Sequence, residues 1–307
     1  MKLGTFQREL LVCANLLSDK IRKIEFDRSS GASQIARNAL DVLLFFAQTS
    51  KSETCRGFVE DFSELGRKLF EARPNMASVQ NLVAQIVYEV NALAEDDLVN
   101  VRKFAASRID ELSQQSVTAV KESAEWAAGI IGNSDCVATC SHSSTVCETF
   151  RIAKQEGKNF KVFVAESRSD DGKFRYGSVV ARFLKSLKIP VEVFLDNEVY
   201  RYVPETKCVL VGVDSVLCDG SVINGSPTYG VAVEAEECGV PFYSVCETTK
   251  ANTLSYLGKN VEVKKGFDLV PSNLITGIVT EKGILDAKEI VEIMKEKSKF
   301  FEIFHGG

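Results

Sequence analysis

The sequence predicts an α/β protein in which an N-terminal all-helical domain is followed by a Rossmann-like domain built on a parallel sheet. Two patterns support this prediction. Up to about residue 131, apolar residues recur at helical spacing and only Pro74 interrupts them. After Asp135, short β-rich runs alternate with helical runs, as in parallel strands joined by helices. We therefore expect two domains, residues 1–131 and residues 132–307.

The first domain is expected to contain about five helices, the last being the longest. This final segment runs from about Asp97 to Ile131 and links the two domains. In the earlier segments apolar residues repeat three or four positions apart, as they do on one face of a helix. These residues are Ile35, Leu40, Leu43 and Leu44, then Phe58, Phe62, Leu65 and Leu69, then Val79, Leu82, Ile86, Val90 and Leu93.

The second domain is expected to place helices on both faces of a parallel sheet. The predicted strands are Cys136–Cys140, Phe160–Ala165, Val191–Leu195, Val209–Val213, Phe242–Val245 and Gly277–Thr280. The predicted helices include Ser144–Gln155, Tyr229–Cys238 and an amphipathic C-terminal helix, Asp286–Lys297, which begins with an acid.

Composition argues against several classes of function. The net charge of -5 and the pI near 5.4 argue against a nucleic-acid-binding surface. No apolar run approaches the roughly 20 residues that span a bilayer, and the N-terminus lacks a signal-peptide pattern. We therefore expect a cytoplasmic protein without a membrane partner. The chain also lacks a P-loop, so we expect no nucleotide hydrolysis.

The cysteines and histidines do not indicate a metal site. Nine cysteines are scattered along the chain, and those in apolar surroundings are typical of reduced core residues. The spacing of Cys136, Cys140 and Cys147 differs from that of zinc sites, and the chain has only two histidines. We expect neither a metal nor another cofactor.

Asp214 is the strongest candidate for a functional acid. It follows the apolar run Cys208–Val213 and precedes the loop Asn224-Gly225-Ser226-Pro227-Thr228. In open α/β sheets, ligands bind at the carboxyl ends of the strands, so an acid at this position indicates a small-molecule site. The alternative is an aspartate that merely stabilises a turn or caps a helix.

Other polar residues suit an anion, phosphate in particular. The segment Thr139-Cys140-Ser141-His142-Ser143-Ser144 ends a predicted strand and opens a helix, whose N-terminus attracts anions. Ser143 and Ser144 are equally consistent with simple helix caps. Arg168 follows the next strand and could bind phosphate bidentately or only balance nearby surface acids.

A third candidate segment lies near the start of the chain. Arg28 and the Gly31-Ala32 turn precede a predicted helix and would add a phosphate contact. On the residues alone, a glycine such as Gly31 is more often only a turn residue.

Several of these motifs resemble one family, in the order in which that family carries them. The matching segments are Ser30–Ser33, Thr139–Ser143, Val164–Arg168, Gly212–Asn224, Thr228–Ala235, Gly239–Tyr243, Glu247–Lys250, Phe267–Pro271 and Ile278–Gly283. Together they resemble the family of the alpha, beta and delta regulatory subunits of translation initiation factor 2B. The same family includes methylthioribose-1-phosphate isomerase and archaeal ribose-1,5-bisphosphate isomerase.

The resemblance implies roles for individual residues. The segment with Gly31 and Ala32 would hold a sugar phosphate. In the isomerases, the aspartate that matches Asp214 works with a cysteine just after the first strand, and the pair moves protons during aldose–ketose conversion. An ungapped match places that cysteine at Ser141, so that Cys140 falls one residue early. If the chain is an isomerase, Asp214 with Cys140 or Ser141 would form the pair.

Two departures from the isomerase pattern count against catalysis. Neighbouring residues on a strand point to opposite faces, so Cys140 does not simply replace Ser141. A serine would also need a base, because its pKa is far above that of a thiol. The second departure is the loop after Asn224, where the usual lysine is Gly225 and the usual glycine is Pro227. A positive charge is therefore missing, and Lys250 would replace it only in part.

The sequence therefore leads to one main hypothesis. We expect a non-catalytic homologue of the initiation factor 2B regulatory subunits that binds a phosphorylated sugar or nucleotide and a protein partner. The family implies a homodimer or assembly with related subunits, with translation initiation factor 2 as a further partner. The alternatives are a ribose-1,5-bisphosphate or related sugar-phosphate isomerase, and a sugar-phosphate binding protein unrelated to translation.

Overall fold

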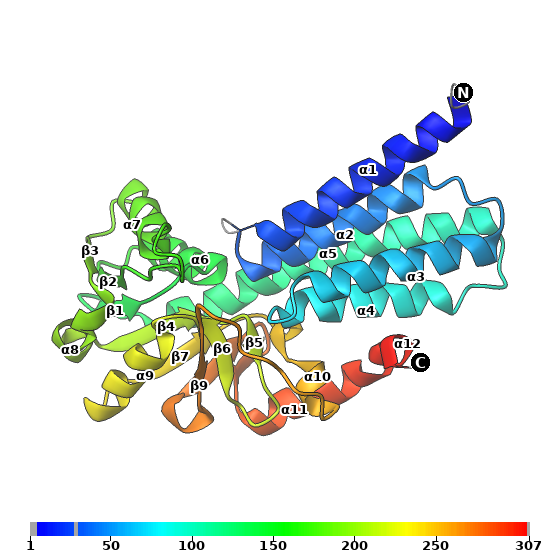
Figure 1. The fold of residues 1–307 in the computed structure, drawn as a ribbon. Helices are drawn as coiled ribbons and strands as arrows, with labels where there is room; N and C mark the ends of the chain where they lie inside the picture. The colour runs from blue at the N-terminus through cyan, green and yellow to red at the C-terminus, as the bar shows by residue number, and fades with distance from the viewer. Residues whose placement is uncertain (1–4, 28–29, 306–307) are drawn as a thin grey trace. The chain divides into compact units, whose positions relative to one another are not determined.

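The computed structural model describes residues 5–27 and 30–305, and the chain forms two compact units (Figure 1). One unit is helical and holds the chain up to Gln115 together with the segment from Lys297 onward. The other is an α/β unit that runs from Ser116 to Glu296. The predicted fold class, a helical N-terminal part followed by a mostly parallel sheet with helices, is confirmed.

The N-terminal part of the helical unit contains, within the described residues, four helices and the first part of a fifth. Their bounds are α1 Thr5–Phe26, α2 Ala32–Thr49, α3 Cys55–Ala72, α4 Ala77–Asn91 and α5 Leu98–Ile130. The apolar residues at helical spacing form the core, where Phe58, Phe62 and Leu69 are fully buried. A Cβ at Gly66 would lie 2.3 Å from Cγ2 of Val87, so α3 and α4 approach closely only because position 66 is glycine.

The end of the chain also packs in the helical unit. A 3₁₀ turn, Lys299–Phe301, leads into α12, Glu302–His305. The ring of Phe70 lies 5.6 Å from that of Phe301 and 4.5 Å from that of Phe304, centroid to centroid. Phe301 is 1% exposed, so this contact belongs to the core of the unit.

The α/β unit is built on a seven-stranded sheet with the order β10-β9-β7-β4-β1-β2-β3. Its strands are β1 Cys136–Thr139, β2 Lys161–Ala165, β3 Val191–Phe194, β4 Cys208–Gly212, β7 Phe242–Val245, β9 Gly277–Thr280 and β10 Gly283–Leu285. All neighbours are parallel except β10, which pairs antiparallel with β9. The six predicted strands therefore exist, each within one residue of its expected bounds, and only β10 was missed.

A second, smaller sheet follows the end of β4 and was not predicted. It consists of β5 Ser215–Val216, β6 Val222–Gly225 and β8 Phe267–Val270, all antiparallel. These strands have only two to four residues. Runs of this length carry little periodicity, which is why the sequence pattern does not separate them from loops. The small sheet carries Asn224 and lies directly after Asp214.

Helices cover both faces of the large sheet, as predicted. On one face, the end of α5, α6 Ser144–Gln155 and α7 Tyr176–Ser186 pack over Val137, Val162 and Leu210. On the other face, α8 Val199–Tyr202, α9 Thr228–Glu237 and α11 Ala287–Ser298 contribute to the core around Val211 and Phe242 (Figure 1). The described part of the chain also contains α10, Thr253–Tyr256.

Candidate functional site

The strand order creates a switch point between β1 and β4. From β1 the chain proceeds to β2 and β3 on one side, whereas β4, β7 and β9 extend the sheet on the other side. The loops after β1 and β4 therefore run in opposite directions, and the crevice between them is the usual ligand site of such sheets. Ser141 follows β1 and Asp214 follows β4, so two predicted site residues lie at this edge.

The loop after β1 is held in an unusual conformation. Ser141 has a φ of 61°, in the left-handed region, and its N–H donates to the Ser167 hydroxyl at 2.7 Å. Two residues later, Ser143 caps α6 by accepting a hydrogen bond from the Val146 N–H at 3.3 Å. A Cβ at Gly212 would lie 2.2 Å from Cβ of Ser143, so the end of β4 needs glycine to let the loop approach.

The N-terminus of α6 has backbone N–H groups that are available to a ligand. Within the residues that the structure describes, the N–H groups of Ser144 and Thr145 have no acceptor. The Thr145 hydroxyl is fully buried and also has no partner there. Ser143 thus acts as a cap, and the N–H groups beside it are still available to an anion.

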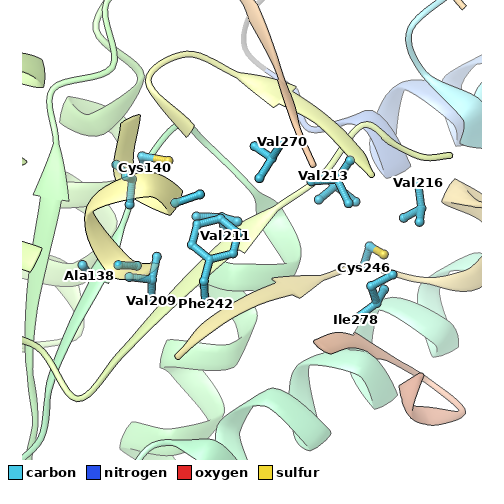
Figure 2. Close-up of a cluster of buried hydrophobic side chains, with 14 of the residues drawn as sticks. Ala138, Cys140, Val209, Val211, Val213, Val216, Phe242, Cys246, Val270 and Ile278 are labelled. Atoms are coloured by element: carbon cyan, nitrogen blue, oxygen red, sulfur yellow. The ribbon is translucent and has the colours of Figure 1, made fainter. Parts of the chain in front are cut away.

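Cys140 lies in the apolar core beneath this edge. Figure 2 draws it in the buried cluster with Val209 and Val211, and it is 1% exposed. Its Sγ lies 3.3 Å from Oγ1 of Thr228, and that hydroxyl gives its own proton to the Gly225 carbonyl at 2.6 Å. The Cys140 thiol is therefore the donor in its own hydrogen bond. Burial raises the pKa of Cys140 to about 12, so the thiol stays protonated at neutral pH.

The loop after Asn224 is organised by Thr228 and by an acid on β8. Asn224 is buried, and its side-chain amide donates to the Thr228 hydroxyl at 2.9 Å. Asp268 accepts from the Ser226 hydroxyl at 2.6 Å and from the Tyr229 N–H at 3.0 Å. These bonds fix the loop on both sides. The Thr228 hydroxyl is hydrogen-bonded to both Asn224 and Cys140.

Arg168 shares a buried carboxylate with a second arginine. Its Nε donates to one oxygen of Glu166 at 2.5 Å, and Nη1 of Arg175 forms an ion pair with the other oxygen at 2.9 Å. Glu166 is only 5% exposed, whereas half or more of each arginine side chain is exposed. The partner of Arg168 is thus Glu166 and not a neighbouring surface acid, and both guanidinium groups keep further N–H donors free for an anion.

Lys250 is a buried cation at the carboxyl end of β7. It ends a 3₁₀ turn, Thr248–Lys250, and is 3% exposed. In the described part of the chain, its ammonium makes no hydrogen bond and no ion pair. The next residue, Ala251, bridges to Val216, two positions after Asp214. Lys250 and Asp214 therefore follow neighbouring strands, and Asp214 itself is half-buried.

The remaining predicted site residues are distributed over both units. Thr139 is buried at the end of β1. Gly31 and Ala32 lie at the start of α2 in the helical unit, where Gly31 occupies the N-cap position. Arg28 lies outside the described residues. The contribution of these three N-terminal residues to a ligand site remains a prediction from the family resemblance.

Sequence reasoning missed Ser167 and Asp196. Ser167 directly follows Glu166 at the end of β2, and Asp196 lies two residues beyond β3. Asp196 accepts hydrogen bonds from the N–H groups of Ser167 and Arg168 at 2.6 and 3.0 Å. Their position after parallel strands is the same signal that indicates Asp214.

Two other hollows lie away from this edge. One, of about 820 Å³, is in the helical unit and is lined by Lys20, Phe26 and Asn38 among others. The second, of about 370 Å³, lies beside β9 and β10. Among residues 5–27 and 30–305, no three cysteine, histidine or acidic side chains cluster as metal ligands would. No helix in these ranges has the length and apolar character to cross a bilayer.

The fold belongs to the class of doubly wound α/β proteins, whose sheets have a switch point in the strand order. The comparison with known families is more specific, because a model of the initiation factor 2 subunit family matches residues 28–266. The chain therefore belongs to this family, and the resemblance found in the sequence is confirmed.

Similar proteins carry two different descriptions. One is a translation initiation factor eIF-2B subunit 2-like protein of Pyrococcus furiosus, 30% identical over 287 residues, which cover 88% of this chain and 98% of that protein. Another is a ribose 1,5-bisphosphate isomerase of the same organism, 28% identical over 308 residues, with 92% and 93% covered. The crystal structure of Pyrococcus horikoshii translation initiation factor eIF-2B superposes with a TM-score of 0.75 at 30% identity, covering 88% and 96%.

Proposed function

We propose that this chain is a non-catalytic regulatory-type member of the initiation factor 2B family that binds a phosphorylated sugar or nucleotide. The observation that carries the proposal is Lys250, a residue that is 3% exposed and whose side chain has no ion-pair partner in the described part of the chain. A buried charge without a partner is costly, and the phosphate of a ligand would supply the missing counter-charge.

Other groups at the same edge support an anionic ligand. The N–H groups of Ser144 and Thr145 are open, and the helix behind them favours negative charge. Arg168 presents free guanidinium donors, and Asn224 lies in the neighbouring loop. In this proposal Lys250, Arg168, Asn224, Thr139 and the Ser143 cap form the ligand-binding edge.

The absence of catalysis follows from the state of the thiol and the hydroxyl. The Cys140 thiol is buried, protonated and committed to Thr228, so it does not exchange protons with a sugar at neutral pH. Ser141 is better exposed, but a hydroxyl needs a base to act. Burial lowers the pKa of the neighbouring His142, which disfavours its protonated form. Asp214 then has no second group to complete an acid–base pair.

The second candidate function is a sugar-phosphate isomerase. It is supported by the relatives described as ribose 1,5-bisphosphate isomerases and by Asp214 at the end of β4. In that case Asp214 would be one proton-transfer group, and Ser141, or Cys140 after a rearrangement of the core, would be the other.

We further propose that the chain acts in the cytoplasm as a homodimer or with related subunits, and that translation initiation factor 2 is a partner. Support comes from the family and from β3, which is an edge strand of the sheet. Val193 and Leu195, on and beside this strand, are 42% and 48% exposed. Exposed apolar residues beside an unpaired edge are typical of surfaces that associate.

The test combines binding with turnover. Calorimetry and thermal shift would use ribose 1,5-bisphosphate, methylthioribose 1-phosphate, AMP and inorganic phosphate, while a coupled assay follows conversion of both aldose phosphates to the ketose. We expect binding of at least one ligand without turnover, and loss of that binding in Lys250→Met. Lys207→Met is the control, because Lys207 is exposed and precedes β4 at the opposite edge of the sheet.

Two outcomes would overturn the proposal. Turnover that disappears in Asp214→Asn would establish the isomerase instead. Binding of none of the four compounds would remove the ligand site from the proposal, leaving an assembly subunit.

A further inference from the structure

Three loops at the carboxyl edge are tied together by one acid and one serine. The Asp196 carboxylate, after β3, accepts the N–H groups of Ser167 and Arg168 at 2.6 and 3.0 Å. The Ser167 hydroxyl, after β2, donates to the Ala165 carbonyl at 3.2 Å and accepts from the Ser141 N–H at 2.7 Å. A continuous chain of hydrogen bonds thus runs from β3 to the loop after β1.

This chain of bonds holds two strained residues. Ser167 has a φ of 51° and Ser141 a φ of 61°, and both lie in the left-handed region that non-glycine residues avoid. Such conformations persist where the surrounding structure determines them, and here the hydrogen bonds of Asp196 and Ser167 do so. Ser167 itself is fully buried, so its hydroxyl has no competing solvent.

We infer that Asp196 and Ser167 are positioning residues of the ligand site, an inference that rests on the proposed function. Asp196 sets the backbone of Arg168, whose guanidinium faces solvent at the edge. Ser167 sets the backbone of Ser141, three residues before the open N–H group of Ser144. The side chains of Asp196 and Ser167 therefore fix the relative positions of the two anion-binding groups, which are the Arg168 guanidinium and the N-terminus of α6.

The acid also has an electrostatic consequence. Asp196 lies close enough to Arg168 to stabilise its charged form, and Glu166 binds the same guanidinium directly. These two carboxylates reduce the positive charge at this part of the edge. The positioning role therefore predicts weaker binding when Asp196 is neutralised, whereas a purely electrostatic role predicts tighter binding of an anion.

The experiment uses Asp196→Asn and Ser167→Gly, each with a matched control. Asp219→Asn is the control for the acid, because Asp219 accepts from the N–H and the hydroxyl of Ser221 in an exposed turn. Ser134→Gly is the control for the serine, because Ser134 also has a left-handed φ, of 65°, but lies before β1 at the opposite edge. Glycine relieves the backbone strain and removes a hydroxyl at both positions, but only Ser167→Gly removes a hydroxyl that bonds the loop of Ser141.

Affinity for ribose 1,5-bisphosphate and for inorganic phosphate is measured by calorimetry, alongside the Tm of each variant. We expect about tenfold weaker binding in Asp196→Asn and in Ser167→Gly, and unchanged binding in both controls. Ser167→Ala, which lacks the hydroxyl but keeps the Cβ, is expected to lose as much affinity as Ser167→Gly, because both remove the bond to Ser141. A variant with a lower Tm but unchanged affinity would not support the positioning role.

The outcomes separate this inference from the proposed function. If the wild-type chain binds and Lys250→Met does not, but Asp196→Asn and Ser167→Gly bind like wild type, the positioning role is wrong and the proposed function stands. Tighter binding in Asp196→Asn would likewise contradict positioning and leave an electrostatic role. If the wild-type chain binds neither probe, both the site and the positioning role are rejected.

Discussion

The hydroxyl oxygen of Ser141 lies 2.7 Å from the point that a Cβ at Gly225 would occupy. Together with Pro227, these are the positions at which the sequence departs from the isomerase pattern, Ser141 after β1 and Gly225 at the end of β6. The departures at positions 141 and 225 are therefore in contact and are not independent of each other. Any side chain at position 225 requires Ser141 to move.

A first prediction concerns this contact. Gly225→Ala is expected to lower the free energy of unfolding by about 1 kcal/mol, because the new methyl group overlaps the Ser141 hydroxyl. In a Ser141→Gly background the same change should cost less, giving a coupling of at least about 0.5 kcal/mol in a double-mutant cycle. Urea unfolding of the four proteins measures it.

The matched control for this cycle is Gly230→Ala in α9. No atom lies within 4 Å of a Cβ at position 230, so alanine there should stabilise the helix by up to about 1 kcal/mol. Strict additivity between positions 141 and 225 would show that the contact has no energetic weight.

A second prediction concerns the buried charge of Lys250. In the absence of ligand, Lys250→Met is expected to raise the free energy of unfolding by about 1–4 kcal/mol, because an apolar side chain of similar length replaces a charged residue that is 3% exposed. The gain is measured by urea unfolding in phosphate-free buffer. A stability loss of that size would instead mean that Lys250 is satisfied within the protein.

A third prediction concerns pH. Burial raises the pKa of Cys140, Cys147 and Cys208 to about 12, and that of Cys136 to about 11. An unfolded thiol has a pKa of about 8.5, so above that pH the unfolded chain releases protons that the folded chain keeps. Stability is therefore fully present below about pH 8.5 and falls as the pH rises toward 12.

The decline is measured as the free energy of unfolding in urea between about pH 8 and pH 10.5. Cys208→Ala should reduce the slope of this decline by up to about 1.4 kcal/mol per pH unit, because the variant lacks one thiol with a raised pKa. Cys218→Ser should leave it unchanged, since Cys218 is exposed. Equal slopes in all three proteins would contradict the assignment of the buried thiols.

A fourth prediction concerns the C-terminal aromatic contact. Phe301→Ala is expected to destabilise the helical unit by about 3–5 kcal/mol, because it removes a fully buried ring that packs on Phe70. Phe26→Ala is the control, since Phe26 is 66% exposed and should change stability by less than about 0.5 kcal/mol. Thermal and urea unfolding measure both variants, and similar effects of the two changes would refute the contact.

The order of helices and strands could be predicted from periodicity, because each of these elements contains several apolar residues at regular spacing. Phe58, Phe62 and Leu69 mark one helix face, and the apolar run of β4 marks a strand buried on both sides. The small sheet of β5, β6 and β8 could not be predicted, since its strands are too short to show a period. The domain limits of 1–131 and 132–307 remain a prediction.

The site was predicted in part. Asp214 is a candidate because it follows an apolar strand, and Lys250 because it could in part replace the lysine of the family pattern. The structure places the two residues after the neighbouring strands β4 and β7. Their roles as catalytic or ligand-binding groups remain predictions. The bond between Ser167 and Ser141 was not predictable, because it joins residues 26 positions apart through a strand pairing that the sequence does not specify.

The sequence by itself determined the family, the order of helices and strands, and the edge at which functional groups gather, because these depend on local period and on the chemistry of short motifs. Only the tertiary structure decided the state of individual groups. Cys140 is a protonated donor to a threonine 88 positions away, and Lys250 is buried without an anion in the described part of the chain. The protonation and burial of a side chain depend on neighbours that are distant in the sequence and are brought together by folding, so local sequence patterns do not predict them.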